Sequence, residues 1–479
     1  MTKEKMTNFR WIICILLFFA TTVNYLDRQV LSLTWKDFIV PEFHWTDDDY
    51  GTITAVFSII YALCNLFAGK FIDWLGTKKG YLWAIFVWSI GACLHALCGE
   101  GAKLLSTAGF VSMMGVTISV WLFLACRAVL ALGEAGNFPA AIKVTAEYFP
   151  KKDRAFSTSI FNSGSSVGAL VAPLTIPLIA RYCGWEWAFV IIGALGFVWM
   201  GFWVSLYRKP IENSRVNAAE LEYIRQDDSE DIASAPEECE EPKISYAKAF
   251  SLKHTWALVL GRLLTDGVWW FFLFWTPGYI SDQFGYKSDT CEGMALVFTL
   301  YAIVTAVSIL LCKLPTWMVN RRGMNPYEGR MVAMFVFACF PLLALGAQPL
   351  GVWGVSCSPG IKLAAAFGVA AIIGLACAGH QAWSANVYSV VGDMFPKSTI
   401  ATLTGIAQCA AGCGSFIINK SAGKLFTYAG NAGDAFCFCG YSGKPAGYMV
   451  LFSYCAIAYI AGWICMKSLV PRYEKVIIK

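Results

Sequence analysis

The sequence predicts an all-α polytopic membrane protein, and three observations carry this prediction. Apolar residues make up 57% of the 479 residues and charged residues only 14%, whereas soluble domains have about 45–50% and about 25%. The mean hydropathy is +0.56. Apolar runs of about 20 residues, the length that crosses a bilayer as a helix, recur along the whole chain. One amphipathic helix of a soluble protein does not account for so many runs.

The apolar segments fall into two sets of six. The first set lies at roughly 9–33, 50–70, 79–99, 110–136, 155–180 and 186–207, and the second at roughly 254–281, 293–313, 329–347, 361–391, 399–422 and 446–469. A polar, charged stretch separates the two sets. We therefore predict twelve transmembrane helices, arranged as an N-terminal six-helix bundle at 1–207, a linker at 208–253 and a C-terminal six-helix bundle at 254–479.

Charge on the loops predicts the topology. Basic residues cluster on loops of the side that carries both termini: Lys78–Lys79, Lys151–Lys152–Arg154 and Arg321–Arg322. The first loop of the other side carries Asp47–Asp48–Asp49 instead. Because positive charge biases loops to the cytoplasm, we expect both termini and the linker to be cytoplasmic. The net charge of +5 therefore indicates topology rather than a nucleic-acid partner.

A weak internal repeat supports two related halves. The loop Gly69–Gly80 (GKFIDWLGTKKG) and the loop Leu314–Gly323 (LPTWMVNRRG) are both short, basic and closed by glycine. Two unrelated basic turns are the alternative, but the loops hold equivalent positions in each half. Two helical halves with a site between them at the bilayer midplane are typical of secondary transporters. We assign a gating role to five residues of the first loop: Gly69, Asp73, Gly76, Lys78 and Lys79.

Four charged residues inside apolar segments are the main functional candidates. Asp27 and Arg28 lie in the first segment, where a charge near mid-bilayer costs about 2.5–3.5 kcal/mol. In the fourth segment Arg127 and Glu134 are seven residues apart, two helical turns, and so share one face. We expect Arg127 to pair with Glu134 or with Asp27, and the two carboxylates to be the best proton carriers. A purely structural buried ion pair is the alternative.

Further polar and aromatic residues at mid-depth are candidate substrate contacts. Each has a plainer alternative: helix–helix hydrogen bonding for the polar side chains, and packing for the aromatic ones. The seventh segment also carries an Arg262–Asp266 pair, and Arg262 lies near an end of its helix, where it can snorkel. The candidates are Tyr61, Ser165, Asp266, Trp269, Trp270, His380, Gln381, Asn386 and Gln408.

The 18 cysteines are scattered through apolar stretches and there behave as small buried hydrophobes. Cys437 and Cys439 form a C-x-C in a polar loop, where a disulfide or metal role is conceivable. No matching histidine cluster accompanies them. We expect no metal and no cofactor.

The motifs NYLDRQ, YALCNLFAGKFIDWLGTKKGY, RAVLALGEAGNFPAAIKVTAEYFPKKDRA and FNSGSSVGALVAP resemble the anion:cation symporter branch of the major facilitator superfamily. The resemblance covers essentially the whole chain. Arg262–Asp266 and His380–Gln381 resemble bacterial glucuronate/galacturonate carriers. Ser165 and Gln408 depart from the galactonate carriers, which have Gln and Asn there. This resemblance implies a bacterial inner (plasma) membrane location.

The resemblance also implies residue roles. The position matching Arg28 binds the substrate carboxylate, those matching Asp27 and Glu134 take up protons, and the one matching Arg127 supports the latter. Tyr61 matches a substrate-contacting tyrosine.

We expect a proton-coupled importer of a hexuronate, with Trp269 or Trp270 against the sugar ring and the chain acting as a monomer. The alternatives are a symporter of another organic anion, such as an aldonate or an aldarate, and a membrane sensor that binds without transport. A membrane enzyme is disfavoured because the chain has no metal-ligand spacing, nucleophile elbow or phosphate loop. The partners implied are a sugar acid, protons and the lipid bilayer, with no nucleic acid.

Overall fold

The computed structural model describes residues 5–113, 115–226, 245–395, 397–473 and 476. The first half comprises α1 (Phe9–Thr34), η1 (Trp35–Ile39), α2 (Val40–Phe43), α3 (Asp47–Leu75), α4 (Thr77–Leu94), η2 (His95–Leu97), α5 (Cys98–Thr107), α6 (Ile118–Glu134), α7 (Asn137–Tyr148), α8 (Lys151–Cys183) and α9 (Trp185–Leu206). Next come η3 (Pro210–Glu212), α10 (Ala218–Ile224) and α12 (Tyr246–Phe250).

The second half comprises α13 (Lys253–Phe284), α14 (Cys291–Leu311), α15 (Leu314–Arg322), α16 (Pro326–Cys339), η4 (Phe340–Gly346), α17 (Ala347–Val355), α18 (Pro359–Met394), α19 (Lys397–Ala432), η5 (Gly433–Ala435) and α20 (Gly443–Leu469). Eleven helical segments of the described chain are long and apolar enough to cross a membrane. The 36-residue α19 runs between two of them. The predicted helical fold is confirmed, and its twelve spans agree with this arrangement.

One predicted boundary is wrong. The fourth span was expected from residue 110, but β1 (Ser112–Met113) pairs antiparallel with β2 (Val116–Thr117), and α6 begins only at Ile118. Gly109 and Gly115 have φ values of +88° and +75°. Positive φ interrupts a right-handed helix, so an apolar composition does not make this stretch helical.

The acidic triplet at 47–49 is the start of a helix. Thr46 and Asp49 form a capping box: the Asp49 amide donates to Thr46 Oγ1 at 3.2 Å, and the Thr46 amide donates to Asp49 Oδ2 at 2.9 Å. Negative charge at a helix N-terminus also complements the helix dipole. The triplet therefore fixes where α3 begins, in addition to marking one side of the membrane.

The two halves approach most closely along α3 and α19. A Cβ on Gly51 would lie 2.7 Å from the Asn419 carbonyl oxygen, and one on Gly412 would lie 2.1 Å from the Ala62 Cβ. Small residues let membrane helices pack at short backbone distance. The contact between α3 and α19, which we call the α3–α19 seam, therefore requires glycine at these two positions.

The linker is anchored to the first half. Glu220 of α10 is fully buried, and its carboxylate accepts the backbone amides of Phe9 at 2.9 Å and Arg10 at 3.0 Å. These are amides at the start of α1, which has no intrahelical partner for them. Arg10 Nη1 completes the contact at 3.1 Å from the same carboxylate. A linker residue thus caps the first transmembrane helix.

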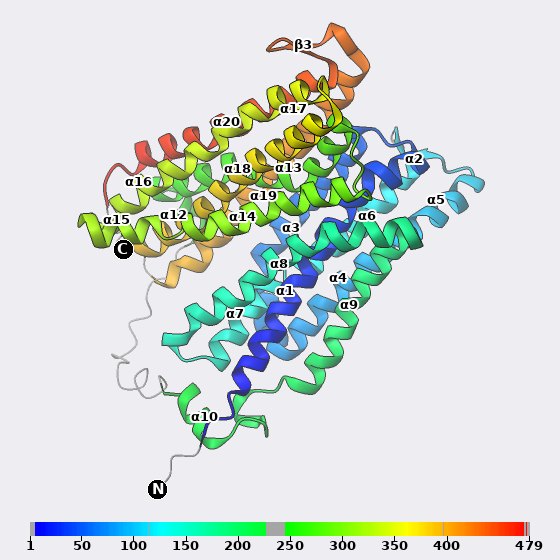
Figure 1. Ribbon diagram of the computed structural model, residues 1–479. Coiled ribbons are helices and arrows are strands. Elements are labelled where there is room, and N and C mark those ends of the chain that lie inside the picture. Colours follow the sequence, from blue (N-terminus) through cyan, green and yellow to red (C-terminus); the bar gives the residue numbers. More distant parts are fainter. Residues whose placement is uncertain (1–4, 114, 227–244, 396, 474–475, 477–479) are drawn as a thin grey trace.

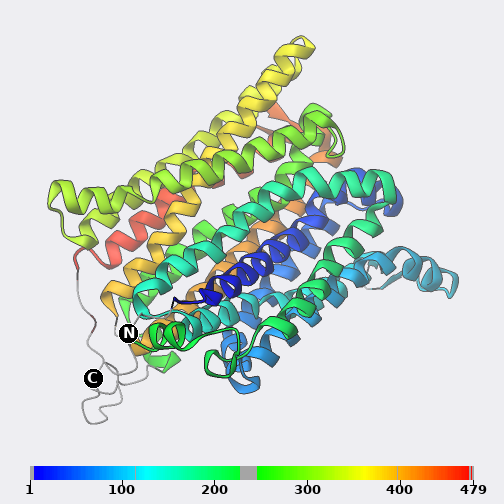
Figure 2. The same cartoon turned by 60° about the horizontal axis from the view of Figure 1, so that its bottom comes forward.

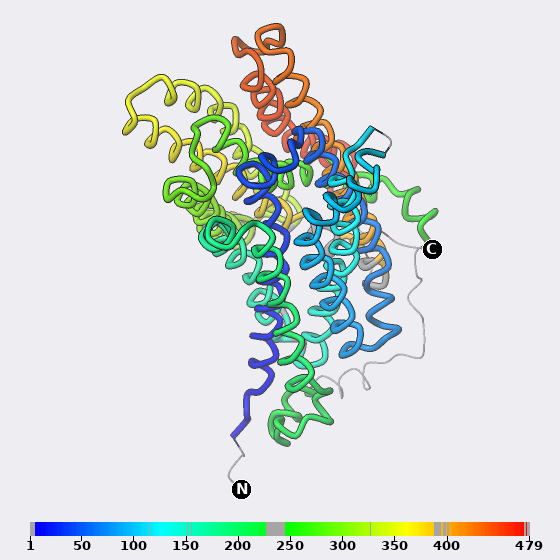
Figure 3. The backbone as a smooth tube through the Cα atoms, turned by 90° about the vertical axis from the view of Figure 1, so that its right-hand side faces the viewer, coloured from blue at the N-terminus to red at the C-terminus, as the bar shows by residue number. Residues whose placement is uncertain are grey.

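Figure 1 shows two helical bundles that meet near α2 and α17 and separate toward α7 and α15. In Figure 2 the start of α1 (dark blue) and the end of α20 (red) lie toward the same end of the molecule. The tube in Figure 3 runs from the blue N-terminus up α1 to the opposite end, where the orange β3–β4 (Cys437–Phe438 and Tyr441–Ser442) segment lies. We call these ends the termini side and the distal side.

Candidate functional site

An ion pair between α1 and α6 lies in the interior of the first half. Arg28 Nη2 lies 2.6 Å and its Nε 3.0 Å from Glu134 Oε2, and both side chains are almost completely buried. Arg127 was expected to pair with Glu134 or Asp27. Seven residues of helix separate Arg127 from Glu134 by about 10 Å, and α1 brings Arg28 to the carboxylate instead.

Aromatic rings from both halves surround Arg28. Its guanidinium carbon lies 4.8 Å from the ring centroid of Tyr61 and 5.1 Å from that of Tyr25. Trp270, from α13 in the second half, lies 4.9 Å away. Such distances are those of cation–π contacts. The cation is therefore enclosed by one ion pair and an aromatic cage to which both halves contribute.

Asp27 and Arg127 are buried beside this pair, but they do not satisfy all of its hydrogen-bonding groups. Among the described residues, both carboxylate oxygens of Asp27, Nη1 of Arg127 and Oε1 of Glu134 have no hydrogen-bond partner. A buried ionised group without a partner is costly. This region thus holds the unused hydrogen-bonding capacity that a proton or an anionic ligand can satisfy.

A second buried polar cluster lies in the other half. Arg262 Nη2 pairs with Asp266 at 2.7 Å, and its Nη1 donates to Ser384 Oγ at 2.7 Å. His380 Nδ1 is 2.6 Å from the Tyr459 hydroxyl, and its ring stacks on Trp269 at 5.3 Å. Trp269 and His380 are thus engaged with each other inside the C-terminal half.

The remaining predicted substrate contacts differ in their exposure and in whether their polar groups already have hydrogen-bond partners. Tyr61 and Gln381 are partly exposed, and the described residues provide no hydrogen bond to the Tyr61 hydroxyl or the Gln381 amide. Ser165 Oγ donates to the Asn162 carbonyl at 2.7 Å, and Asn386 Nδ2 donates to the Ala382 carbonyl at 2.8 Å. Gln408 is partly exposed and has a partner.

A ring of four charges closes the distal side. Lys36 and Asp47 come from the first half, and Asp282 and Lys444 from the second. Lys36 lies 2.9 Å from Asp282 and 3.8 Å from Asp47. Lys444 lies 2.5 Å from Asp282 and 2.9 Å from Asp47. Each lysine therefore contacts one aspartate of its own half and one of the other half.

Hydrogen bonds extend this closure. Asp37 accepts the Ser288 amide at 2.8 Å and the Ser281 hydroxyl at 2.7 Å, and the Asp48 amide donates to Thr427 Oγ1 at 2.9 Å. Where both partners are described, hydrogen bonds between the halves run only from the distal end to about mid-depth. Among these charges, only the acidic triplet at 47–49 had been singled out from the sequence, as a marker of one side of the membrane.

The predicted gating loop lies on the termini side and makes its contacts within the first half. Asp73 pairs with Lys143 at 2.6 Å, and Lys78 Nζ donates to the Val204 carbonyl at 3.1 Å. Gly76 has φ of +77° and ends α3, while Gly69 faces open space and Lys79 is exposed. The loop is thus not bonded to the second half by any described residue.

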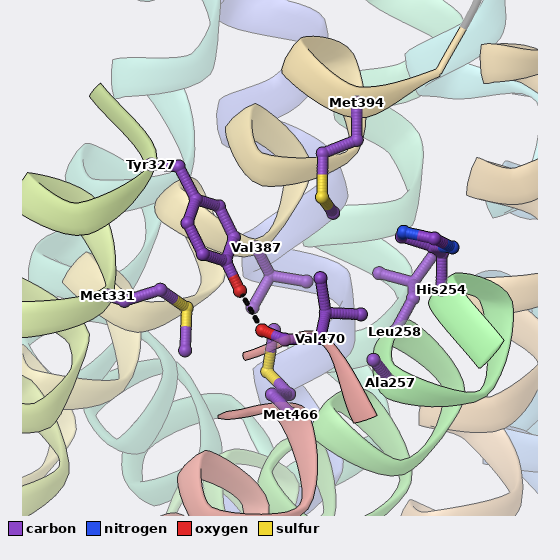
Figure 4. Close-up of a pocket in the computed structure, with 9 residues that line it drawn as sticks. All are labelled: His254, Ala257, Leu258, Tyr327, Met331, Val387, Met394, Met466 and Val470. Carbon is purple, nitrogen blue, oxygen red and sulfur yellow. Dashed lines mark hydrogen bonds between the residues drawn. The ribbon is translucent and has the colours of Figure 1, made fainter. Parts of the chain in front are cut away.

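A pocket in the second half lies outside the charged network. Figure 4 shows that Tyr327, Met331, Met394 and Met466 line it, and the Tyr327 hydroxyl donates to the Val470 carbonyl. Its volume is about 10 Å³, close to that of a single water-sized probe. It is a packing gap rather than a substrate site. The cysteines that the structure describes, Cys437 and Cys439 included, are all free thiols.

Two helical bundles that share a buried arginine cage and meet at one end have the architecture of a secondary transporter. The chain belongs to the Major Facilitator Superfamily, whose model matches residues 17–419. The family consists of transporters rather than enzymes, and the predicted fold and class are confirmed.

Curated relatives are transporters of sugar acids. The hexuronate transporter of Escherichia coli is 26% identical over 427 residues, with 88% of this chain and 89% of that protein covered. The D-galactonate transporter of Escherichia coli is 24% identical, with 87% and 89% covered. The galacturonate transporter of Dickeya chrysanthemi is 28% identical, with 62% and 79% covered. These similarities support transport of an organic acid across a membrane.

Solved structures share the fold. A bacterial homologue of the human lysosomal transporter Spinster has a TM-score of 0.69 at 16% identity, with 96% of this chain and 98% of that chain covered. The D-xylose–proton symporter has a TM-score of 0.65 at 15% identity, with 94% and 96% covered.

Proposed function

We propose that this protein imports a hexuronate, such as glucuronate or galacturonate, together with protons across a bacterial inner membrane. The observation that carries the proposal is the buried Arg28–Glu134 pair inside an aromatic cage. A guanidinium binds a carboxylate through two parallel hydrogen bonds, and aromatic faces suit the apolar face of a sugar ring. The curated relatives support a sugar acid as the substrate class.

Proton coupling follows from the same pair. Glu134 occupies the arginine fork that a substrate carboxylate needs, and a protonated carboxyl binds a guanidinium far less strongly than a carboxylate does. Proton uptake at Glu134 therefore frees Arg28 for substrate. Asp27, buried without a hydrogen-bond partner among the described residues, is the second proton site, with Arg127 supporting both. Each ligand moves the equilibrium only as far as its affinities for the two states differ.

Under this proposal the distal side faces the periplasm and both termini are cytoplasmic. The closed distal ring then corresponds to an inward-facing state. Rocking of the halves about the α3–α19 seam opens the ring and closes the termini side. Tyr61, Gln381 and Trp270 are the contacts best disposed to meet substrate, because they are partly exposed.

Uptake of labelled glucuronate into proteoliposomes, with and without an inward proton gradient, tests the proposal. We expect accumulation only with the gradient. Glu134→Gln is expected to abolish accumulation but retain counterflow exchange, whereas the exposed Glu328→Gln serves as a control without effect. Accumulation that is independent of the gradient, or unchanged in Glu134→Gln, contradicts proton coupling. Competition by galacturonate, galactonate and galactarate then ranks the substrates.

A further inference from the structure

A basic groove on the termini side of the second half is not part of the transport pathway described above. It has a volume of about 400 Å³ and is lined by Cys312, Lys313, Thr316, Trp317, Asn320 and Arg321. From residue 313 onward these positions follow the i, i+3, i+4, i+7 and i+8 spacing of one helix face. They belong to α15 and the residues just before it, at the end of α14.

Hydrogen-bond donors dominate the groove. Lys313, Thr316, Trp317, Asn320 and Arg321 are all exposed, and no carboxylate lines the groove. No described residue forms an ion pair with Lys313 or Arg321, or hydrogen-bonds their side chains. The groove therefore presents two cations and several uncharged donors with no internal anion.

The equivalent loop of the first half contains a carboxylate that the basic groove lacks. Aligning Gly80 with Gly323 places Trp74 opposite Trp317 and Asp73 opposite Thr316. In the first half Asp73 pairs with Lys143 at 2.6 Å. The second half has threonine at that position. The basic groove of α15 thus lacks the carboxylate that its counterpart contains.

We propose that this groove binds the headgroup of an anionic phospholipid. Trp317 is 46% exposed, and Ile309 and Leu310 at the end of α14 are 58% and 65% exposed. These apolar side chains lie on a membrane-spanning segment and lead into the groove, so they provide a path for acyl chains. Tryptophan is enriched at the headgroup level, and basic residues there attract anionic lipids. A free phosphate ion makes no use of the exposed apolar end of α14.

Lipid binding to the purified full-length protein, measured by native mass spectrometry, tests the proposal with phosphatidylglycerol, phosphatidylcholine and inorganic phosphate as probes. We expect phosphatidylglycerol to be preferred. Each basic residue contributes about fivefold near an anionic surface, so Lys313→Gln/Arg321→Gln is expected to weaken phosphatidylglycerol binding about 30-fold. The control Lys209→Gln/Arg472→Gln removes the same charges from exposed sites on the same side and is expected to change it less than twofold.

Three outcomes overturn the proposal. These are unchanged phosphatidylglycerol binding in the double variant, equal binding of phosphatidylcholine, and displacement of phosphatidylglycerol by inorganic phosphate at similar concentration, which indicates a small-anion site. If the double variant unfolds at a lower temperature without lipid, the single variants Lys313→Gln and Arg321→Gln replace it. Each is expected to lose about fivefold, and no loss in either contradicts the site.

Discussion

Opening of the distal ring can be perturbed without touching the arginine cage. In the closed state Lys36–Asp282 and Lys444–Asp47 join the two halves, each at 2.9 Å. Lys36–Asp47 and Lys444–Asp282 lie within one half and persist when the halves separate. Replacing both aspartates by asparagine therefore removes two pairs that exist only in the closed state.

The size of the effect follows from the exposure of the four side chains. They are 14–23% exposed, between surface pairs worth about 0–1 kcal/mol and hydrogen bonds to charged groups worth about 1.5–3 kcal/mol. About 1.5 kcal/mol for each cross-half pair gives about 3 kcal/mol in total. The equilibrium between closed and open distal sides is then expected to shift about 150-fold toward open.

Two backbone amides report this opening directly. The Ser288 amide donates to Asp37 and the Asp48 amide donates to Thr427, in both cases across the halves. Hydrogen exchange of such amides follows the population of the open state. Exchange measured by mass spectrometry on peptides covering 35–50 and 280–292 is expected to accelerate by up to about 150-fold in Asp47→Asn/Asp282→Asn.

Asp434→Asn is the matched control, because Asp434 lies on the same side and, within the part of the chain that the structure describes, its carboxylate bonds only Ser442 of its own loop. Unchanged exchange in the double variant, or equal acceleration in the control, refutes the assignment of the ring as the distal gate. Acceleration spread over α4 and α16 as well indicates general destabilisation and also contradicts it.

Three further predictions concern other parts of the molecule. Arg28→Lys removes the paired hydrogen bonds of the guanidinium and the stacking of its plane on the aromatic rings. The apparent affinity for labelled glucuronate in uptake assays should therefore fall about 30-fold. An unchanged KM contradicts the role of Arg28 in binding the anion. Burial raises the pKa of Glu220, but the hydrogen bonds from Thr7 and from the α1 start outweigh it and leave the pKa below its ordinary value. Its stabilisation is therefore present above the unfolded pKa and lost as pH falls through the lower folded pKa, so Glu220→Gln should cost about 2 kcal/mol at neutral pH and nothing in strong acid, as measured by unfolding at each pH. Gly412→Val should lower the yield of folded protein by overpacking α3 against α19, whereas Gly430→Ala on the same helix meets open space and should not.

Much of the architecture follows from the sequence because apolar run length and loop charge are local properties. The spans, the two halves and the four buried charges of the first half needed no knowledge of helix packing. Predicting the partner of Glu134 did require knowledge of helix packing. Whether Arg127 or Arg28 reaches that carboxylate depends on the rotation and tilt of α1 against α6, which residue spacing on one helix does not encode.

The distal ring could not be predicted from the sequence for a related reason. Lys36, Asp47, Asp282 and Lys444 lie near helix ends, where charged residues are common and carry little information by themselves. More than 200 residues separate Asp47 from Asp282 along the chain, and only the docking of two bundles brings them together. His380 was a candidate substrate contact, but its ring is already in contact with Tyr459 and Trp269. Residue type alone does not reveal such neighbours.

The Arg28–Glu134 contact has a consequence for how an acid leaves the site. A carboxylate fixed 2.6 Å from the guanidinium is a tethered competitor, and its effective concentration does not depend on how much solute is in the surrounding solution. Under the proposed function, an acid held by Arg28 is therefore exchanged for an internal group rather than released from a bare cation. Accumulated product in the compartment then has to outcompete that fixed carboxylate before it can rebind.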